Sequence, residues 1–125
     1  MNNFCFFKEL EHGISEGMSI YDFLSKKPFK NKQKVVNYLK NGHIIVSTPG
    51  LSADVLSNDN TVSGVPSILS DGSWVWTGDL AYYVENYNLM PPVKMLQIME
   101  KNNWQVPSLS KKDLVAICEY LDHME

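Results

Sequence analysis

Residues 67–88 read SILSDGSWVWTGDLAYYVENYN, and this stretch decides the fold because it predicts a hairpin followed directly by a helix. The dipeptide Asp71-Gly72 lies between two short runs of β-forming residues. It suits a two-residue type I′ turn, in which both central residues adopt positive φ. Such a turn pairs Leu69 with Trp74. Both faces of this hairpin are largely apolar, so helices or a partner must cover them.

The remaining elements follow from helical spacing and capping residues. Thr77 or Asp79 can cap the helix after the hairpin, and Ser110 begins a capping-box-like pattern for the last helix. Further helices are expected after Ser19, at residues 30–41 and after Pro91-Pro92, and a strand is expected near 43–48. The sequence predicts one α+β domain over residues 1–125, with a small mostly antiparallel sheet (strand near 43–48 and hairpin 66–77) packed with about five or six helices.

Three local details complete this prediction. Gly42 directly follows the lysine-rich helix and suits a left-handed position after its last turn. The polar segment 51–64 reads as a loop that can include one helical turn around residues 53–56. Cys118 falls on the apolar side of the last helix, which predicts a small buried side chain.

Composition is that of a globular protein, with 44% apolar and 20% charged residues in a chain of 125. The N-terminal apolar run Phe4 to Phe7 is too short for a signal-peptide core or a membrane span. Cys5 and Cys118 are the only cysteines, and neither belongs to a CxxC pair. We therefore expect reduced thiols, a cytoplasmic location and no membrane association.

Charge is segregated along the chain although the formal net charge is only −3. Residues 26–40 contain six lysines and no acid, whereas residues 41–93 contain five acids and no lysine. The chain has no arginine, the side chain best suited to planar recognition of phosphate or guanine. Direct binding of nucleic acid is therefore not expected.

Motifs that carry chemistry are missing from the sequence. It has no phosphate-binding loop and no GxSxG elbow. His12, His43 and His123 do not show the spacing that places two imidazoles on one metal ion. We therefore predict a protein that is not an enzyme and has no catalytic residues, cofactor or metal.

Aromatic residues gather around the hairpin and the following helix, with Trp74 and Trp76 on one face of a strand and Tyr82 shortly after. Such rings pack in a core in most proteins, but Trp and Tyr also dominate interface hot spots when they are partly exposed. Acids flank them at Asp71 and Asp79. An aromatic surface rimmed by negative charge would suit a basic protein partner.

The segment DGSWVWTGDLAYYVENYNLMPP, from Asp71 to Pro92, resembles a pattern found in small uncharacterised bacterial proteins. The pattern is Asp-Gly-x-Trp-x-Trp, a short spacer, a Tyr-Tyr helix and a proline-led helix. The whole chain is similar to immunity proteins of bacterial contact-dependent growth inhibition (CDI) systems. This resemblance implies a small, cytoplasmic α+β protein that binds and neutralises a cognate toxin domain, commonly a nuclease.

A nuclease needs a cationic groove for its polyanionic substrate, and an inhibitor can offer carboxylates and aromatic rings to that groove. The partner-binding residues expected on this basis are Asp54, Asp59, Asp71, Trp74, Trp76, Asp79, Tyr82 and Glu85.

Two other functions stay open on the sequence. One is a regulatory or adaptor module that binds a different protein through the Trp-Tyr region. The other is a weak RNA or anionic-surface binder that uses the lysine-rich helix 30–41, where Phe29 and Tyr38 are interleaved with the lysines. The identity of the toxin, the contact face and the oligomeric state are not specified by the sequence.

Overall fold

A hairpin of β5 (Ile68–Ser70) and β6 (Trp74–Thr77) forms the middle of the sheet in the computed structural model, which describes residues 1–124. Its pairing places Leu69 opposite Trp76, two residues away from the predicted register. Each side chain of the hairpin still lies on the sheet face predicted for it, because a shift of two residues does not exchange the two faces.

The predicted type I′ turn is wrong. Gly72 has a φ of 97°, but neither Asp71 nor Ser73 has a positive φ. The backbone N–H of Asp71 bonds to the carbonyl of Trp74, so Gly72 and Ser73 are the central residues. Glycine at the first central position is the requirement of a type II′ turn. The Asp71 carboxylate accepts hydrogen bonds from the N–H groups of Ser73 (2.9 Å) and Trp74 (2.8 Å), which keeps Asp71 outside the turn.

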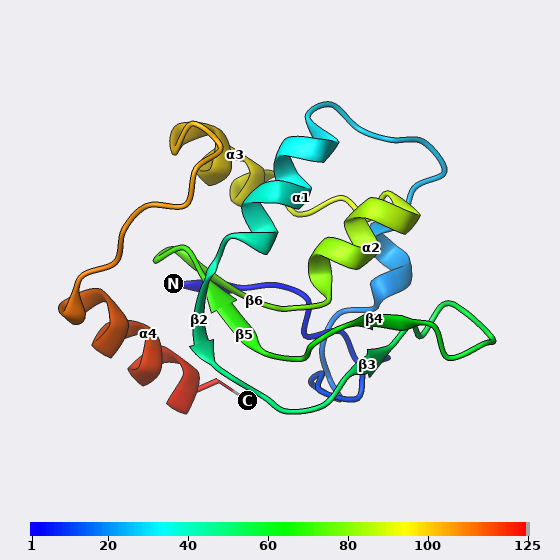
Figure 1. Cartoon of the computed structure of the whole chain (residues 1–125), viewed down its shortest axis with the longest axis horizontal. Coiled ribbons are helices and arrows are strands. Elements are labelled where there is room, and N and C mark those ends of the chain that lie inside the picture. The colour runs from blue at the N-terminus through cyan, green and yellow to red at the C-terminus, as the bar shows by residue number, and fades with distance from the viewer. Residues whose placement is uncertain (125) are drawn as a thin grey trace.

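The sheet has four strands in the order β1-β6-β5-β2 (Figure 1). Strand β2 (His43–Val46) is antiparallel to β5, which confirms the strand expected near 43–48. Strand β1 (Asn2–Asn3) is parallel to β6, so the sheet is mixed but mostly antiparallel. The α+β fold class is therefore confirmed.

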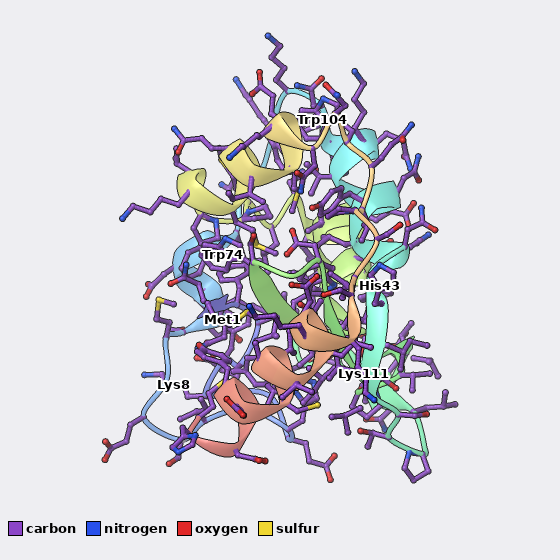
Figure 2. The ribbon with its side chains drawn as sticks, turned by 90° about the vertical axis from the view of Figure 1, so that its left-hand side faces the viewer. Met1, Lys8, His43, Trp74, Trp104 and Lys111 are labelled. Atoms are coloured by element: carbon purple, nitrogen blue, oxygen red, sulfur yellow. The ribbon has the colours of Figure 1, made fainter. Side chains whose placement is uncertain are left out.

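Four α-helices surround this sheet within residues 1–124: α1 (Lys32–Lys40), α2 (Leu80–Tyr87), α3 (Val93–Lys101) and α4 (Lys111–Asp122). Figure 1 shows α1 and α2 side by side above the sheet, while α4 lies on its other side next to β2. Figure 2 looks from the α4 side, and most residues of this helix are exposed. Ser110 forms the expected capping box with Asp113 at the start of α4.

The expected five or six helices are too many. The segment after Ser19 forms only a single 3-10 turn, Ile20–Phe23. One hydrogen-bonded turn is present near the expected position, since the N–H of Ser57 bonds to the carbonyl of Asp54 at 3.4 Å. The segment read as a loop also contains a second, two-stranded sheet of β3 (Ser52–Ala53) and β4 (Val62–Gly64). Strands of two and three residues are too short for an alternating sequence pattern to reveal them.

Two apolar clusters lie on opposite faces of the four-stranded sheet. The larger contains Leu69, Trp74 and Trp76 with residues of α1, α2 and α3. The smaller contains Val75 with Ile117 of α4. Helices thus cover both faces of the hairpin, which answers the question that its apolar sequence raised.

Two predicted details differ from the structure. Gly42 is not left-handed; a Cβ there would lie 2.6 Å from the indole of Trp76, so close packing is what requires glycine. Cys118 is exposed, because Ile117 is the only residue of α4 that is buried. Only a narrow side of α4 packs on the sheet, and the Cys118 side chain does not lie on that side.

Candidate functional site

The eight residues expected to bind a partner fall into two groups. Five are buried, with exposed fractions of 3% for Asp54, 2% for Asp71, 0% for Asp79, 7% for Trp74 and 0% for Trp76. The other three, Asp59, Tyr82 and Glu85, are exposed or half-buried. Only this second group can meet a partner without rearrangement of the fold.

The two tryptophans belong to the core. Trp76 is completely buried, donates its indole N–H to the carbonyl of Leu39 at 3.3 Å and lies beside the ring of Tyr38. Trp74 packs in the same cluster. Their alternation along β6 directs both rings toward α1 and α2.

Asp71 connects the hairpin turn to α1. Besides the two backbone N–H groups of the turn, its carboxylate accepts the hydroxyl of Tyr38 at 2.6 Å. Asn102, just after α3, donates to the same hydroxyl at 3.0 Å. Burial and the hydrogen bond to Asp71 raise the pKa of Tyr38, so this hydroxyl stays protonated and remains a donor.

Asp79 connects the start of α2 to the N-terminal segment. Thr77 donates its hydroxyl to one carboxylate oxygen at 2.6 Å, and Nε2 of His12 lies 3.0 Å from the other. Asp79 occupies the predicted cap position of α2, but its side chain does not bond to the helix. Its oxygens are already engaged with Thr77 and His12.

Cys5 adds its thiol to the Asp79 carboxylate at 3.8 Å. Burial, followed by the charge of Asp79, raises the pKa of this thiol well above its ordinary value. A thiol that stays protonated and donates to a carboxylate is a structural hydrogen-bond donor rather than a nucleophile.

Asp54 connects the segment between β3 and β4 to α2. One carboxylate oxygen accepts the hydroxyls of Tyr82 (2.8 Å) and Tyr87 (2.5 Å), and the other accepts the N–H of Leu56 at 2.7 Å. The hydrogen bond to Asp54 raises the pKa of Tyr82, and it raises that of Tyr87 to about 12. The aspartate and both tyrosines therefore form a fixed node.

The loop that follows Asp54 is closed by its own hydrogen bonds. The N–H of Asp54 bonds to the carbonyl of Thr61 at 2.8 Å, and the carboxylate of Asp59 accepts the hydroxyls of Ser57 and Thr61. These bonds, first that from Ser57, lower the pKa of Asp59 to about 2. The loop thus holds a permanent negative charge on the surface.

Asp59 also lies close enough to Tyr82 and Tyr87 for its charge to raise their pKa values. We call Asp54, Asp59, Tyr82 and Tyr87 the tyrosine–aspartate cluster. Its exposed part combines a carboxylate with two half-buried phenol rings, a composition typical of protein interfaces. Glu85, on the exposed side of α2, instead lies 3.7 Å from Lys40.

Half of the lysines in the 26–40 block have partners within the chain. Lys32 donates to Asn88 at 2.7 Å, and Lys34 lies 5.8 Å from the ring centre of Trp104, which Figure 2 labels beyond the end of α3. Lys40 faces Glu85. The lysine-rich helix therefore uses part of its charge for contacts with α2 and the segment after α3.

Within residues 1–124, no cluster of three or more His, Cys, Asp or Glu side chains could hold a metal ion. None of the helices in that range has the length and apolar character needed to span a membrane. Comparisons with protein-family models, curated proteins and solved structures found no match to this chain.

Sequence reasoning missed the structural use of the buried aspartates, as well as the role of His12. The tyrosines that bind Asp54 lie 28 and 33 residues away in the chain, and Asp79 is 67 residues from His12. Pairs so far apart in the chain cannot be recognised from the spacing of residues in the sequence. The one available signal was the density of tyrosine in α2, because a buried hydroxyl needs a hydrogen-bond partner.

Proposed function

We propose that this protein is an immunity protein, which binds a cognate bacterial toxin domain and neutralises it by protein–protein contact. A nuclease domain is the toxin class that we favour, because its substrate-binding groove must be cationic. The proposal adds the geometry of an acidic surface to the sequence resemblance described above.

The observation that carries the proposal is the tyrosine–aspartate cluster. Asp59 is exposed, keeps its charge and belongs to a loop whose ends are closed and whose base is bonded to α2. A charged group that is already fixed loses little conformational entropy when it binds a partner. Tyr82 and Tyr87 add rigid aromatic area next to it, as interface hot spots require.

The direct test is binding and protection. The full chain is mixed with the toxin domain encoded by the adjacent upstream gene, binding is measured by calorimetry, and growth is followed in cells that express both. We expect a one-to-one complex and rescued growth. A lack of both complex and rescue, with a folded chain, contradicts the proposal.

The surface is tested by an isosteric change of charge. Asp59→Asn preserves the side-chain acceptor for Ser57 and Thr61 but removes the charge, and it should raise the dissociation constant about tenfold, mostly through a slower association rate. Glu100→Gln, an equal change of charge on α3, is the matched control. Equal effects of the two changes would show that only net charge matters.

A further inference from the structure

A cavity of about 500 Å³ lies between residues 9–12 of the N-terminal segment and residues 48–55, which include β3. This volume is within the usual range of ligand-binding sites, about 300–1,000 Å³. Its apolar wall consists of Leu10, Pro49, Leu51, Ala53, Val55 and Pro66. The wall could therefore accommodate a short hydrocarbon stem.

The charged groups around the cavity are almost all acidic. Glu9, Glu11 and Asp79 line it together with His12, and no lysine does. Glu9 is fixed, because its carboxylate accepts the hydroxyl of Ser19 at 2.6 Å and the N–H of Ile20 at 2.8 Å. The cavity therefore combines an apolar wall with carboxylates of defined position, which favours a cationic group.

His12 adds a polar group to the wall of the cavity beside these carboxylates. Its Nε2 faces the Asp79 carboxylate, which already receives the hydroxyl of Thr77 and acts as an acceptor. Nε2 therefore donates to Asp79, and Nδ1 is the ring nitrogen that is left for another contact. This Nδ1 is buried and has no hydrogen-bond partner among residues 1–124. The structure thus leaves one polar atom of His12, a residue that lines the cavity, without a partner.

Leu51 indicates that the occupant belongs to a larger molecule. It lines the cavity, yet its exposed fraction is 69%. A protein that inserts one residue into the cavity would cover this side chain together with the rim around it.

We propose that the cavity binds a lysine or arginine side chain of the partner protein, with its stem along the apolar wall and its cationic head at Glu9 and Glu11. This inference rests on the proposed function and names the group by which the toxin domain would be anchored. Long basic side chains pack their methylene groups on apolar surface while the head stays polar, as this cavity requires.

The first experiment needs no partner. The full chain, labelled with ¹⁵N, is titrated by NMR with n-butylamine and butylguanidine, and with butyrate and n-butanol as controls of the same length. We expect the cations to shift the amides of Leu10 and Ala53 and the ring signals of His12, with dissociation constants on the order of 1–10 mM. No shift by the cations, or equal shifts by butyrate, overturns the inference.

The second experiment separates a partner side chain from a free amine. The double variant Glu9→Gln, Glu11→Gln should weaken butylamine binding at least fivefold and toxin binding roughly tenfold. Glu16→Gln with Glu100→Gln is the control of equal charge, since neither residue lines this cavity. If the first variant weakens amine binding but leaves toxin binding unchanged, the cavity takes free amines only and the partner assignment fails, while the proposed function stands.

Discussion

The hydroxyl of Tyr38 on α1 donates a 2.6 Å hydrogen bond to the buried carboxylate of Asp71 at the hairpin turn. The same carboxylate holds the two N–H groups that follow it, so a single side chain sets the turn geometry and attaches the turn to a helix. Asn102 extends the connection to the end of α3. This contact therefore joins the sheet to two of the helices that cover it.

Tyr38→Phe should lower the free energy of unfolding by about 1.5–3 kcal/mol, because it removes a buried hydrogen bond to a charged group. Urea denaturation followed by tryptophan fluorescence measures this change. Tyr21→Phe is the matched control, since Tyr21 is 61% exposed. A loss below about 0.5 kcal/mol for Tyr38→Phe, similar to that of the control, would show that the contact does not stabilise the fold.

The contact also shows how far the sequence could predict this fold. The hairpin, α1, α2, α3 and α4 carry local signals such as alternation, helical spacing and the Ser110 capping box, and all five are present. The predicted turn is displaced by one residue because the Asp71 carboxylate accepts the N–H groups of Ser73 and Trp74, an arrangement that competes with an Asp-Gly turn centre. The short strands β3 and β4 have no local signal of their own.

The candidate site was harder to predict for the same reason. Acidic residues in polar loops are usually solvated, so the sequence suggested that Asp54 and Asp79 face a partner. Burial of these carboxylates becomes possible only because groups from distant segments help to satisfy them. The tyrosine hydroxyls of α2 do so at Asp54, and the His12 ring and the Cys5 thiol do so at Asp79. Asp59 differs because its partners, Ser57 and Thr61, are local, and it remains on the surface.

Gly42→Ala tests the close approach of the chain to Trp76. The added Cβ would lie 2.6 Å from the indole and 3.1 Å from Cβ of Leu69, and neither side chain can move freely in the core. Overpacking of this kind costs about 1–3 kcal/mol of stability, which thermal unfolding would report. Gly50→Ala is a useful comparison, because the φ of Gly50 is 94° but nothing surrounds it. A smaller loss for Gly42→Ala than for Gly50→Ala would contradict the packing argument.

Ser110→Ala should destabilise the protein by about 1 kcal/mol, because it removes half of a capping box. The Ser110 hydroxyl accepts the N–H of Asp113 at 3.1 Å, and the Asp113 carboxylate accepts the N–H of Ser110 at 2.8 Å. Since α4 buries only Ile117, hydrogen exchange should report the loss mainly in this helix. Ser108→Ala, at an exposed position before the cap, should have almost no effect, and an equal loss there would argue against a specific cap.

The tyrosine–aspartate cluster predicts instability at high pH. The pKa of Tyr87 is raised to about 12 in the folded protein, from about 10 in an unfolded chain, because its hydroxyl donates to Asp54. A raised folded pKa contributes stability that is complete below pH about 10 and is lost as the pH rises through about 12. Titration of phenolate absorbance should show Tyr87 ionising late, near pH 12. Tyr87→Phe should remove one phenol from this late absorbance, to which the buried Tyr38 also contributes, and should flatten the decline in stability between pH 10 and 12. If Tyr82→Phe lowered the absorbance that appears near pH 12 and Tyr87→Phe did not, the main hydrogen bond to Asp54 would belong to Tyr82 instead.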